Sequence, residues 1–235
     1  MDLSTIVPEV LEHAKQTMPQ ECCGIAIVFK GRLKYIPCTN QLSGDVFCIS
    51  PDDYLKAEAM GEIVGICHSH VNISAHPSEA DKAACEVTGL PWLIVSIPGD
   101  TYYQHNPTGI KASLIGRPFY HGVYDCYSLL RDYYKEKLNI ELNDYKREVE
   151  WWEKGYDLYE DNFRSEGFVE VDIKNIQEHD IILMQNGSDK INHAAIYLGD
   201  GIILHHCVNR LSSRDVYGGY WLKNTRYVIR HKTIL

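Results

Sequence analysis

The chain has 235 residues, of which 45% are hydrophobic and 23% are charged, and this balance is ordinary for one large globular domain or two smaller ones. Its formal net charge of -9 argues against nucleic acid as the main partner, because phosphate binding needs a basic surface. No apolar run approaches the roughly 20 residues of a membrane span, and the N-terminus lacks the features of a secretory signal. We therefore expect synthesis in a cytoplasm, with the eight cysteines as free thiols.

The first part of the chain has an α/β pattern that ends at a seam predicted over residues 105–122, where prolines and glycines gather. Ser50 stands at an N-cap position, followed by Pro51 and two acidic residues, which is a strong helix start. The predicted helices cover residues 8–17, 50–60 and 78–87, and the predicted strands cover residues 23–29, 32–38, 62–70, 92–98 and 101–105.

The part after the seam has a different order of elements. A helix is predicted to begin near Cys126, and a polar, aromatic-rich stretch that includes Trp151 and Trp152 follows it. The Gly-Asp-Gly run at 199–201 predicts a tight hairpin. The predicted strands come late, at residues 180–185, 193–199, 201–207 and 225–232. One helix followed by a run of strands predicts an α+β domain.

The segment GICHSHVNISAHPSEADKAA, residues 65–84, concentrates three histidines near a serine and an aspartate. His68 and His70 end an apolar strand, and the period of two places both side chains on one face. Two imidazoles are half of a zinc site, which needs a third ligand. Asp81 is the natural third ligand, because it lies in the first turn of the helix that Ser78 begins. Alternatively, Ser78 and Asp81 form only a helix cap.

A second acidic residue, Glu21, directly precedes a predicted buried strand. It is the candidate base for taking a proton from metal-bound water, although its position also fits a solvated turn residue. With this upstream Glu, the spacing H-x-H-x7-S-x2-D resembles the motif of the JAMM (MPN) metalloproteases over about residues 1–108.

This resemblance implies an α/β domain with a mixed sheet and helices that holds one zinc ion. It implies that the zinc ligands are His68, His70 and Asp81, that Glu21 is the general base, and that Ser78 helps to hold the attacking water or the oxyanion. Many JAMM sequences have proline directly after the second histidine, where this chain has Val71. His76 has no role in the motif and fits a loop residue.

A second group of reactive side chains lies after the seam. Cys126 follows Asp125 at a predicted helix N-terminus, where the helix dipole lowers the pKa of a thiol. His193 begins one predicted strand and His205 lies on the next, so a hairpin can bring both to one edge as base and orienting group. Taken alone, Cys126 also fits an inert buried cysteine.

The Asp-Cys-Tyr-Ser run and the His-x-x-Ile-Tyr-Leu-Gly run resemble the motifs of the NlpC-type cysteine peptidases, over about residues 115–235. This resemblance implies an α+β, papain-like domain that cleaves peptides of bacterial cell walls. The nucleophile, base and third residue would be Cys126, His193 and His205, with His206 as the competing third residue. The family often has glycine where this chain has Ser128, and a tyrosine upstream of the thiol, for which Tyr120 and Tyr124 are candidates.

The two domains in this order, with segments such as GRPFYHGVYDCY, resemble a tail-tip protein family of lambda-like bacteriophages. The resemblance implies two partners, peptidoglycan stem peptides and other tail-tip proteins. It implies a hydrolase that acts during tail assembly or infection and is found in the host cytoplasm, with the virion tail as a further location. Two alternatives are a structural tail component with inactive sites and a cytoplasmic peptidase that processes a tail protein.

Overall fold

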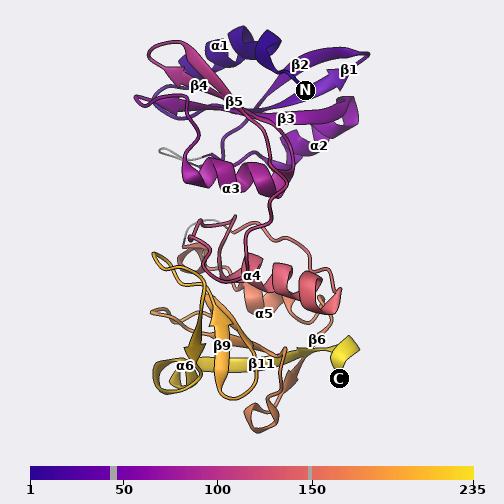
Figure 1. Cartoon of the computed structure of the whole chain (residues 1–235), viewed down its shortest axis with the longest axis vertical. Helices are drawn as coiled ribbons and strands as arrows, with labels where there is room; N and C mark the ends of the chain where they lie inside the picture. The colour runs from indigo at the N-terminus through magenta and orange to yellow at the C-terminus, as the bar shows by residue number, and fades with distance from the viewer. Residues whose placement is uncertain (43–46, 148–149) are drawn as a thin grey trace. The chain divides into compact units, whose positions relative to one another are not determined.

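Two separate β-sheets organise the chain, one in each of the units Met1–Lys111 and Ala112–Leu235 (Figure 1). The computed structural model describes residues 1–42, 47–147 and 150–235. The division between the units falls inside the predicted seam at 105–122. None of the described helices has the length and apolarity needed to cross a membrane.

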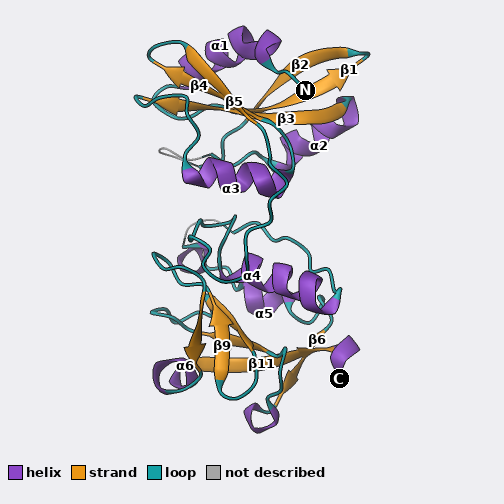
Figure 2. Cartoon of the chain, viewed as in Figure 1, coloured by secondary structure: helices purple, strands orange, loops and turns teal. Residues whose placement is uncertain are grey.

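The first unit follows the predicted elements to within one residue at each end (Figure 2). Its turn at Lys30 and Gly31 has positive φ at both residues, as a tight hairpin requires. Ser50 stands at the N-cap of the second helix but makes no side-chain capping bond there. The elements are α1 (Val7–Thr17), β1 (Cys23–Phe29), β2 (Arg32–Cys38), α2 (Pro51–Met60), β3 (Glu62–Val71), α3 (Glu79–Thr88), β4 (Trp92–Ile97) and β5 (Thr101–His105).

The sheet of the first unit has the strand order β2-β1-β3-β4-β5, in which β3 and β4 are parallel and the other pairs are antiparallel. Helix α1 covers one face, while α2 and α3 lie on the other (Figure 1). Alternate residues of the central strands therefore enter two different cores: Cys67 packs with the α1 side and Ile66 with the α2 and α3 side. His68 and His70 share the face of Ile66.

The second unit is the expected α+β arrangement, with elements that the sequence pattern missed. Strands β6 and β10 and helices α5 and α6 were not predicted, because each is only four or five residues long and the two strands carry charged residues. The elements are α4 (Cys126–Tyr133), a π-helical turn (Tyr134–Leu138), α5 (Leu158–Asn162), β6 (Phe168–Val171), β7 (Ile181–Met184), β8 (His193–Tyr197), β9 (Ile202–His205), β10 (Ser213–Val216), α6 (Gly219–Lys223) and β11 (Thr225–His231).

The second sheet has the order β10-β9-β8-β7-β11-β6, and every neighbouring pair is antiparallel. One face packs against α4 through a large core that contains Leu129, Leu130 and Ile196. The opposite face carries a smaller cluster around Ile182 and Ala195, which Trp221 partly covers. Alternate side chains of β8 and β9 therefore enter either the core beneath α4 or the smaller cluster on the opposite face.

A buried ion pair ties β11 to the residue that precedes β7. Arg230 donates two hydrogen bonds, of 2.7 and 2.8 Å, to the two carboxylate oxygens of Asp180, which is fully buried. Removing one partner of such a pair leaves an uncompensated buried charge.

We expect Asp180→Ala to lower the free energy of unfolding by about 3 kcal/mol, because Arg230 then loses its counter-charge in a buried setting. Lys15→Ala is the control, since its ion pair with Asp100 is about half exposed and such pairs contribute less than about 1 kcal/mol. Urea denaturation followed by circular dichroism measures both. Equal losses in the two variants would contradict the prediction.

Candidate active sites

The first candidate site lies at the end of β3, where His68 and His70 point to the face covered by α3. Their Nε2 atoms are 3.2 Å apart. Asp81 reaches them from the first turn of α3, with Oδ1 3.4 Å from Nε2 of His68 and Oδ2 3.2 Å from Nε2 of His70. The three residues that the sequence predicted as metal ligands are thus brought together, and all are buried or half-buried.

Ser78 and Asp81 are also a helix cap, as the alternative prediction had it. The amide of Asp81 donates to Oγ of Ser78 at 3.1 Å, and the amide and hydroxyl of Ser78 each donate to Oδ2 of Asp81 at 2.7 Å. These bonds hold the carboxylate in the first turn of α3, facing the two histidines. Capping therefore positions the candidate ligand.

Both imidazole rings are held in orientations that direct Nε2 toward Asp81. Nδ1 of His70 lies 2.7 Å from the carbonyl oxygen of Ser74 and donates to it, which leaves Nε2 as the ligand atom. The ring of His68 stacks on Phe47 at 4.6 Å between centroids and meets the edge of Trp92 at 5.4 Å. Such fixed orientations are typical of metal-ligating histidines.

The donor atoms also have separations close to those of a tetrahedral zinc site, with a different carboxylate oxygen of Asp81 near each of the two histidines. With ordinary Zn–N and Zn–O bond lengths, tetrahedral ligands lie about 3.3 to 3.4 Å apart. The measured separations are 3.2, 3.2 and 3.4 Å. Burial opposes protonation of His70, but its bond to Asp81 raises its pKa, and burial lowers the pKa of His68. The residues fit a zinc ion with one open position.

Glu21 is placed beside these ligands by the register of β1 on β3. Cys23 pairs with His68, and Cys22 exchanges backbone and side-chain bonds with Ser69, so Glu21 falls opposite His70. Opposite residues of an antiparallel pair share a face. Glu21 is buried, and its charge is one of the influences that raise the pKa of His70. It is therefore not a solvated turn residue.

His76 lies apart from the ligand group. Its exposed ring packs against Tyr103, with 4.8 Å between centroids. This position agrees with the expectation of a loop residue.

The second candidate site begins at the N-terminus of α4. Asp125 is the N-cap: its carboxylate accepts the amide of Ser128 at 2.8 Å, and the Ser128 hydroxyl accepts the amide of Asp125 at 2.7 Å. Arg147 donates to the same carboxylate at 2.8 Å from a buried position. Ser128, which stands where the family often has glycine, thus completes a capping box and fixes the first turn. Cys126 is the first residue of this helix.

The Cys126 thiol contacts the hydroxyl of Tyr159 of α5, with Sγ and Oη 3.3 Å apart. Burial raises the pKa of the thiol to about 11, and the charge of Asp125 adds to this increase. The expected lowering by the helix dipole is therefore outweighed, because burial penalises the thiolate more than the dipole favours it. The sequence did not indicate Tyr159. Tyr120 and Tyr124, the candidates from the sequence, bridge each other across the turn before the helix.

Cys126 and His193 line the same cavity, which has a volume of about 120 Å³. Nε2 of His193 lies 3.1 Å from Nδ1 of His205, so Nδ1 is the nitrogen of His193 that remains for the thiol. Nε2 of His205 in turn lies 3.8 Å from the carboxylate of Asp215 on β10. The sequence missed Asp215, because only the pairing of β10 with β9 brings it near His205.

His206 does not bond to His193. Neither of its ring nitrogens has a hydrogen-bond partner among the described residues, and its ring packs against Phe119 beside the same cavity. His205 is therefore the histidine that bonds to His193, and His206 lies in the cavity wall.

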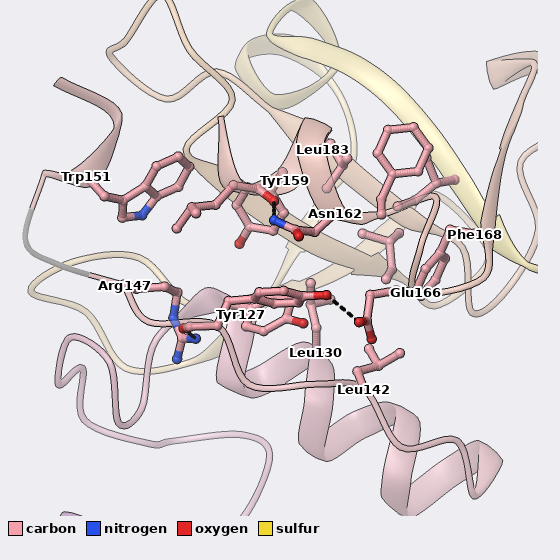
Figure 3. A pocket seen from close by; sticks show the side chains of 15 residues that line it. Tyr127, Leu130, Leu142, Arg147, Trp151, Tyr159, Asn162, Glu166, Phe168 and Leu183 are labelled. Atoms are coloured by element: carbon pink, nitrogen blue, oxygen red, sulfur yellow. Dashed lines mark hydrogen bonds between the residues drawn. The ribbon is translucent and has the colours of Figure 1, made fainter. Parts of the chain in front are cut away.

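An apolar pocket shares Arg147, Trp151 and Tyr159 with this cavity. Figure 3 shows Tyr127 and Leu130 of α4 on one side of it and Tyr159 on the other. Its volume is about 40 Å³, a third of that of the cavity that Cys126 and His193 line. The proposed chemistry therefore rests on the larger cavity, and this pocket is part of the packing around Tyr159.

We expect the stability of the protein to fall as pH drops from about 6.5 toward 3. Burial, with His205 and His206 nearby, lowers the pKa of His193 to about 3, whereas the unfolded chain protonates this ring below about pH 6.5. The unfolded state then binds more protons, so this contribution to stability is complete above pH 6.5 and lost below it.

The thermal midpoint between pH 4 and 8 measures the effect, and His193→Gln should flatten its slope. His76→Gln is the control, because that ring is exposed. A slope that stays the same in the His193→Gln protein would show that another group carries the pH dependence.

Comparisons with known proteins agree with both halves of the fold. A family model of the prokaryotic homologs of the JAB domain matches residues 4–108, and a model of the NlpC/P60 family matches residues 116–230. A solved JAB1/MPN domain protein from Archaeoglobus fulgidus is 22% identical, with 46% of this chain and 88% of that chain covered and a TM-score of 0.31. The two domain classes predicted from the sequence are confirmed by the family models.

Two phage proteins match across most of the chain. Tail tip assembly protein K of Escherichia phage N15 is 41% identical over 234 residues, which cover 97% of this chain and 95% of that protein. The protein of the same name from Escherichia phage lambda is 41% identical over 184 residues, which cover 78% of this chain and 89% of that protein. The chain therefore belongs to the family of tail tip assembly protein K from lambda-like phages.

Proposed function

We propose that this protein is a tail-tip peptidase whose second domain hydrolyses peptide bonds in peptidoglycan stem peptides, and whose first domain is a zinc-dependent peptidase. The observation that carries the proposal is the cavity shared by Cys126 and His193, with His205 bonded behind His193. The match of residues 116–230 to the NlpC/P60 family model supports a peptidase assignment for this domain.

The chain of contacts from Asp215 through His205 to His193 sets the direction of proton transfer at the second site. Asp215 favours a proton on Nε2 of His205, so Nδ1 of His205 accepts from Nε2 of His193. Nδ1 of His193 is then unprotonated and takes the thiol proton of Cys126 as its sulfur attacks the scissile carbonyl. The proton later passes to the leaving amine, and water releases the acyl group. Amides at the start of α4 and the hydroxyl of Tyr159 are the candidates for stabilising the oxyanion.

In the first domain, His68, His70 and Asp81 would hold the zinc ion, which supplies a Lewis acid and a water of lowered pKa. Glu21 stands opposite His70 and is proposed to take the proton from the attacking water. Ser78, whose hydroxyl is bonded to Asp81, keeps the carboxylate in place and is proposed to help hold the water or the oxyanion.

The two sites suit different substrates in one assembly. The tail-tip names of the relatives support other tail proteins as partners, and a tail is a means by which a wall peptidase can meet peptidoglycan. We propose that the protein works in the host cytoplasm during assembly and in the virion tail at infection. The same names favour one second candidate, in which the first domain processes a tail protein.

We expect Cys126→Ala to reduce the digestion of purified cell walls by at least about 1000-fold, because the nucleophile is lost. His205→Ala should retain more activity, since His205 orients the base and does not attack. Loss of turbidity and mass spectrometry of the released peptides measure both. Cys48→Ala, at a half-buried thiol of the first unit, is the matched control. Normal wall digestion by the Cys126→Ala protein would refute this assignment.

We expect His70→Ala to lose one equivalent of bound zinc from the full chain, because two remaining ligands hold the ion poorly. Elemental analysis after zinc titration and gel filtration measures the content. His76→Ala is the matched control in the same loop region, and it should keep the full content. Equal zinc content in the two variants would exclude the predicted ligand set.

A further inference from the structure

A second group of metal-ligating side chains lies in the second unit, on the face of the sheet opposite α4. Ala195 of β8 pairs with His205 of β9, and continuing this antiparallel register places His193 opposite Cys207. His205 and Cys207 are two residues apart, so they share a face with His193. This His-x-Cys spacing at a strand end parallels the His68-x-His70 spacing of the first unit.

The donor atoms of this group are already at metal-binding distances. Nε2 of His193 is 3.1 Å from Nδ1 of His205, and Sγ of Cys207 is 3.8 Å from the first and 3.6 Å from the second. A tetrahedral zinc ion with ordinary bond lengths separates two nitrogens by about 3.3 Å and a nitrogen from a sulfur by about 3.6 Å. The three atoms thus fit one ion without rearrangement of the strands.

The surroundings of the group are those of a ligand site. His193 and His205 are buried, and the ring of Trp221 packs against both, with 4.6 Å between its centroid and that of His205. The carboxylate of Asp215 accepts from Nε1 of Trp221 at 3.0 Å and lies on the Nε2 side of His205. A carboxylate behind the other nitrogen of a histidine fixes its tautomer for metal binding through Nδ1.

We propose that His193, His205 and Cys207 form a second metal site, which takes a thiophilic divalent cation such as Zn²⁺ and switches off the thiol peptidase. On binding, the Cys207 thiol loses its proton to solvent and the thiolate and the two imidazole nitrogens donate to the cation. The set of two imidazoles and one thiolate suits Zn²⁺ or Co²⁺ and disfavours Mg²⁺ or Ca²⁺.

Inhibition follows from the tautomer of His193. When Nε2 donates its lone pair to a cation, the ring proton of the neutral imidazole resides on Nδ1, which is the nitrogen proposed to take the thiol proton. The base is then unable to accept the Cys126 proton. This consequence rests on the proposed peptidase function of Cys126, whereas the metal site itself does not.

Cobalt binding to the full chain carrying His70→Ala tests the site, because that substitution disables the ligand set of the first unit. We expect about one equivalent of Co²⁺ to bind reduced protein and to produce a near-ultraviolet sulfur-to-cobalt charge-transfer band. Two imidazoles and a carboxylate lack a sulfur ligand, so the band reports only a thiolate site. Absence of the band would overturn the proposal.

Three cysteine variants in this background identify the sulfur. Cys207→Ser should abolish the band and weaken cobalt binding at least tenfold, since even the loss of a group behind a ligand costs about 10- to 100-fold in affinity. Cys126→Ser and Cys48→Ser are the matched controls among the half-buried thiols, and both should keep the band. A band that persists in Cys207→Ser, or disappears in Cys126→Ser, would overturn the assignment.

A second test leaves Cys207 in place, so it still decides the question if circular dichroism shows that the Cys207→Ser protein is unfolded. Bound cobalt should slow alkylation of Cys207 by iodoacetamide at least tenfold, as mapped by mass spectrometry, and leave Cys48 unchanged. Equal rates at Cys207 with and without cobalt would refute the site.

The inhibitory role has its own readout. Zn²⁺ should stop wall digestion by the His70→Ala chain, and a chelator should restore it. The zinc concentration that halves the metal-free rate of each protein should be at least tenfold higher after the further substitution Cys207→Ser. An unchanged concentration would refute the inhibition. If no wall digestion is found without metal, the proposed function fails, while the cobalt spectrum still decides the site.

Discussion

The alternation of side chains along β-strands is the constraint on which both candidate sites depend. In the first unit it places His68 and His70 on one face of β3, and the antiparallel register with β1 adds Glu21 to that face. In the second unit the same rule places His205 and His193 on one face of the β8–β9 hairpin. A shift of either register by one residue would turn these side chains to the opposite face.

Helix caps provide the second half of each site. Ser78 caps α3 and holds Asp81 at the third helical position, while Asp125 caps α4 and holds Cys126 at the first. Both helices have reciprocal capping boxes, with serine and aspartate in opposite order. A cap of this kind contributes about 1 kcal/mol to stability. Because the same hydrogen bonds restrict the first helical turn, they also fix the position of the reactive side chain in that turn.

Burial controls the charge state of the thiol site more than the helix dipole does. It raises the pKa of Cys126 and lowers that of His193, so the resting pair is a neutral thiol beside a neutral imidazole. Such a pair transfers its proton during attack on the substrate rather than beforehand. The His193 ring belongs both to the proposed proton relay and to the cluster with Cys207, so in these two proposals one nitrogen atom links catalysis to metal binding.

The sequence by itself determined the two domain classes and most of their elements, and it predicted candidate residues for both sites. These features arise from short-range rules: strand period, caps, turn residues, and motifs in which ligands follow one another at set spacings. It did not determine the short strands β6 and β10, whose few residues carry no clear period. Tertiary pairing alone decided that His205 rather than His206 bonds to His193, that Tyr159 contacts the thiol, and that Asp215 approaches His205. Each of these contacts joins segments that are far apart in the chain. Packing and strand register bring them together, and a local sequence pattern contains no information about either.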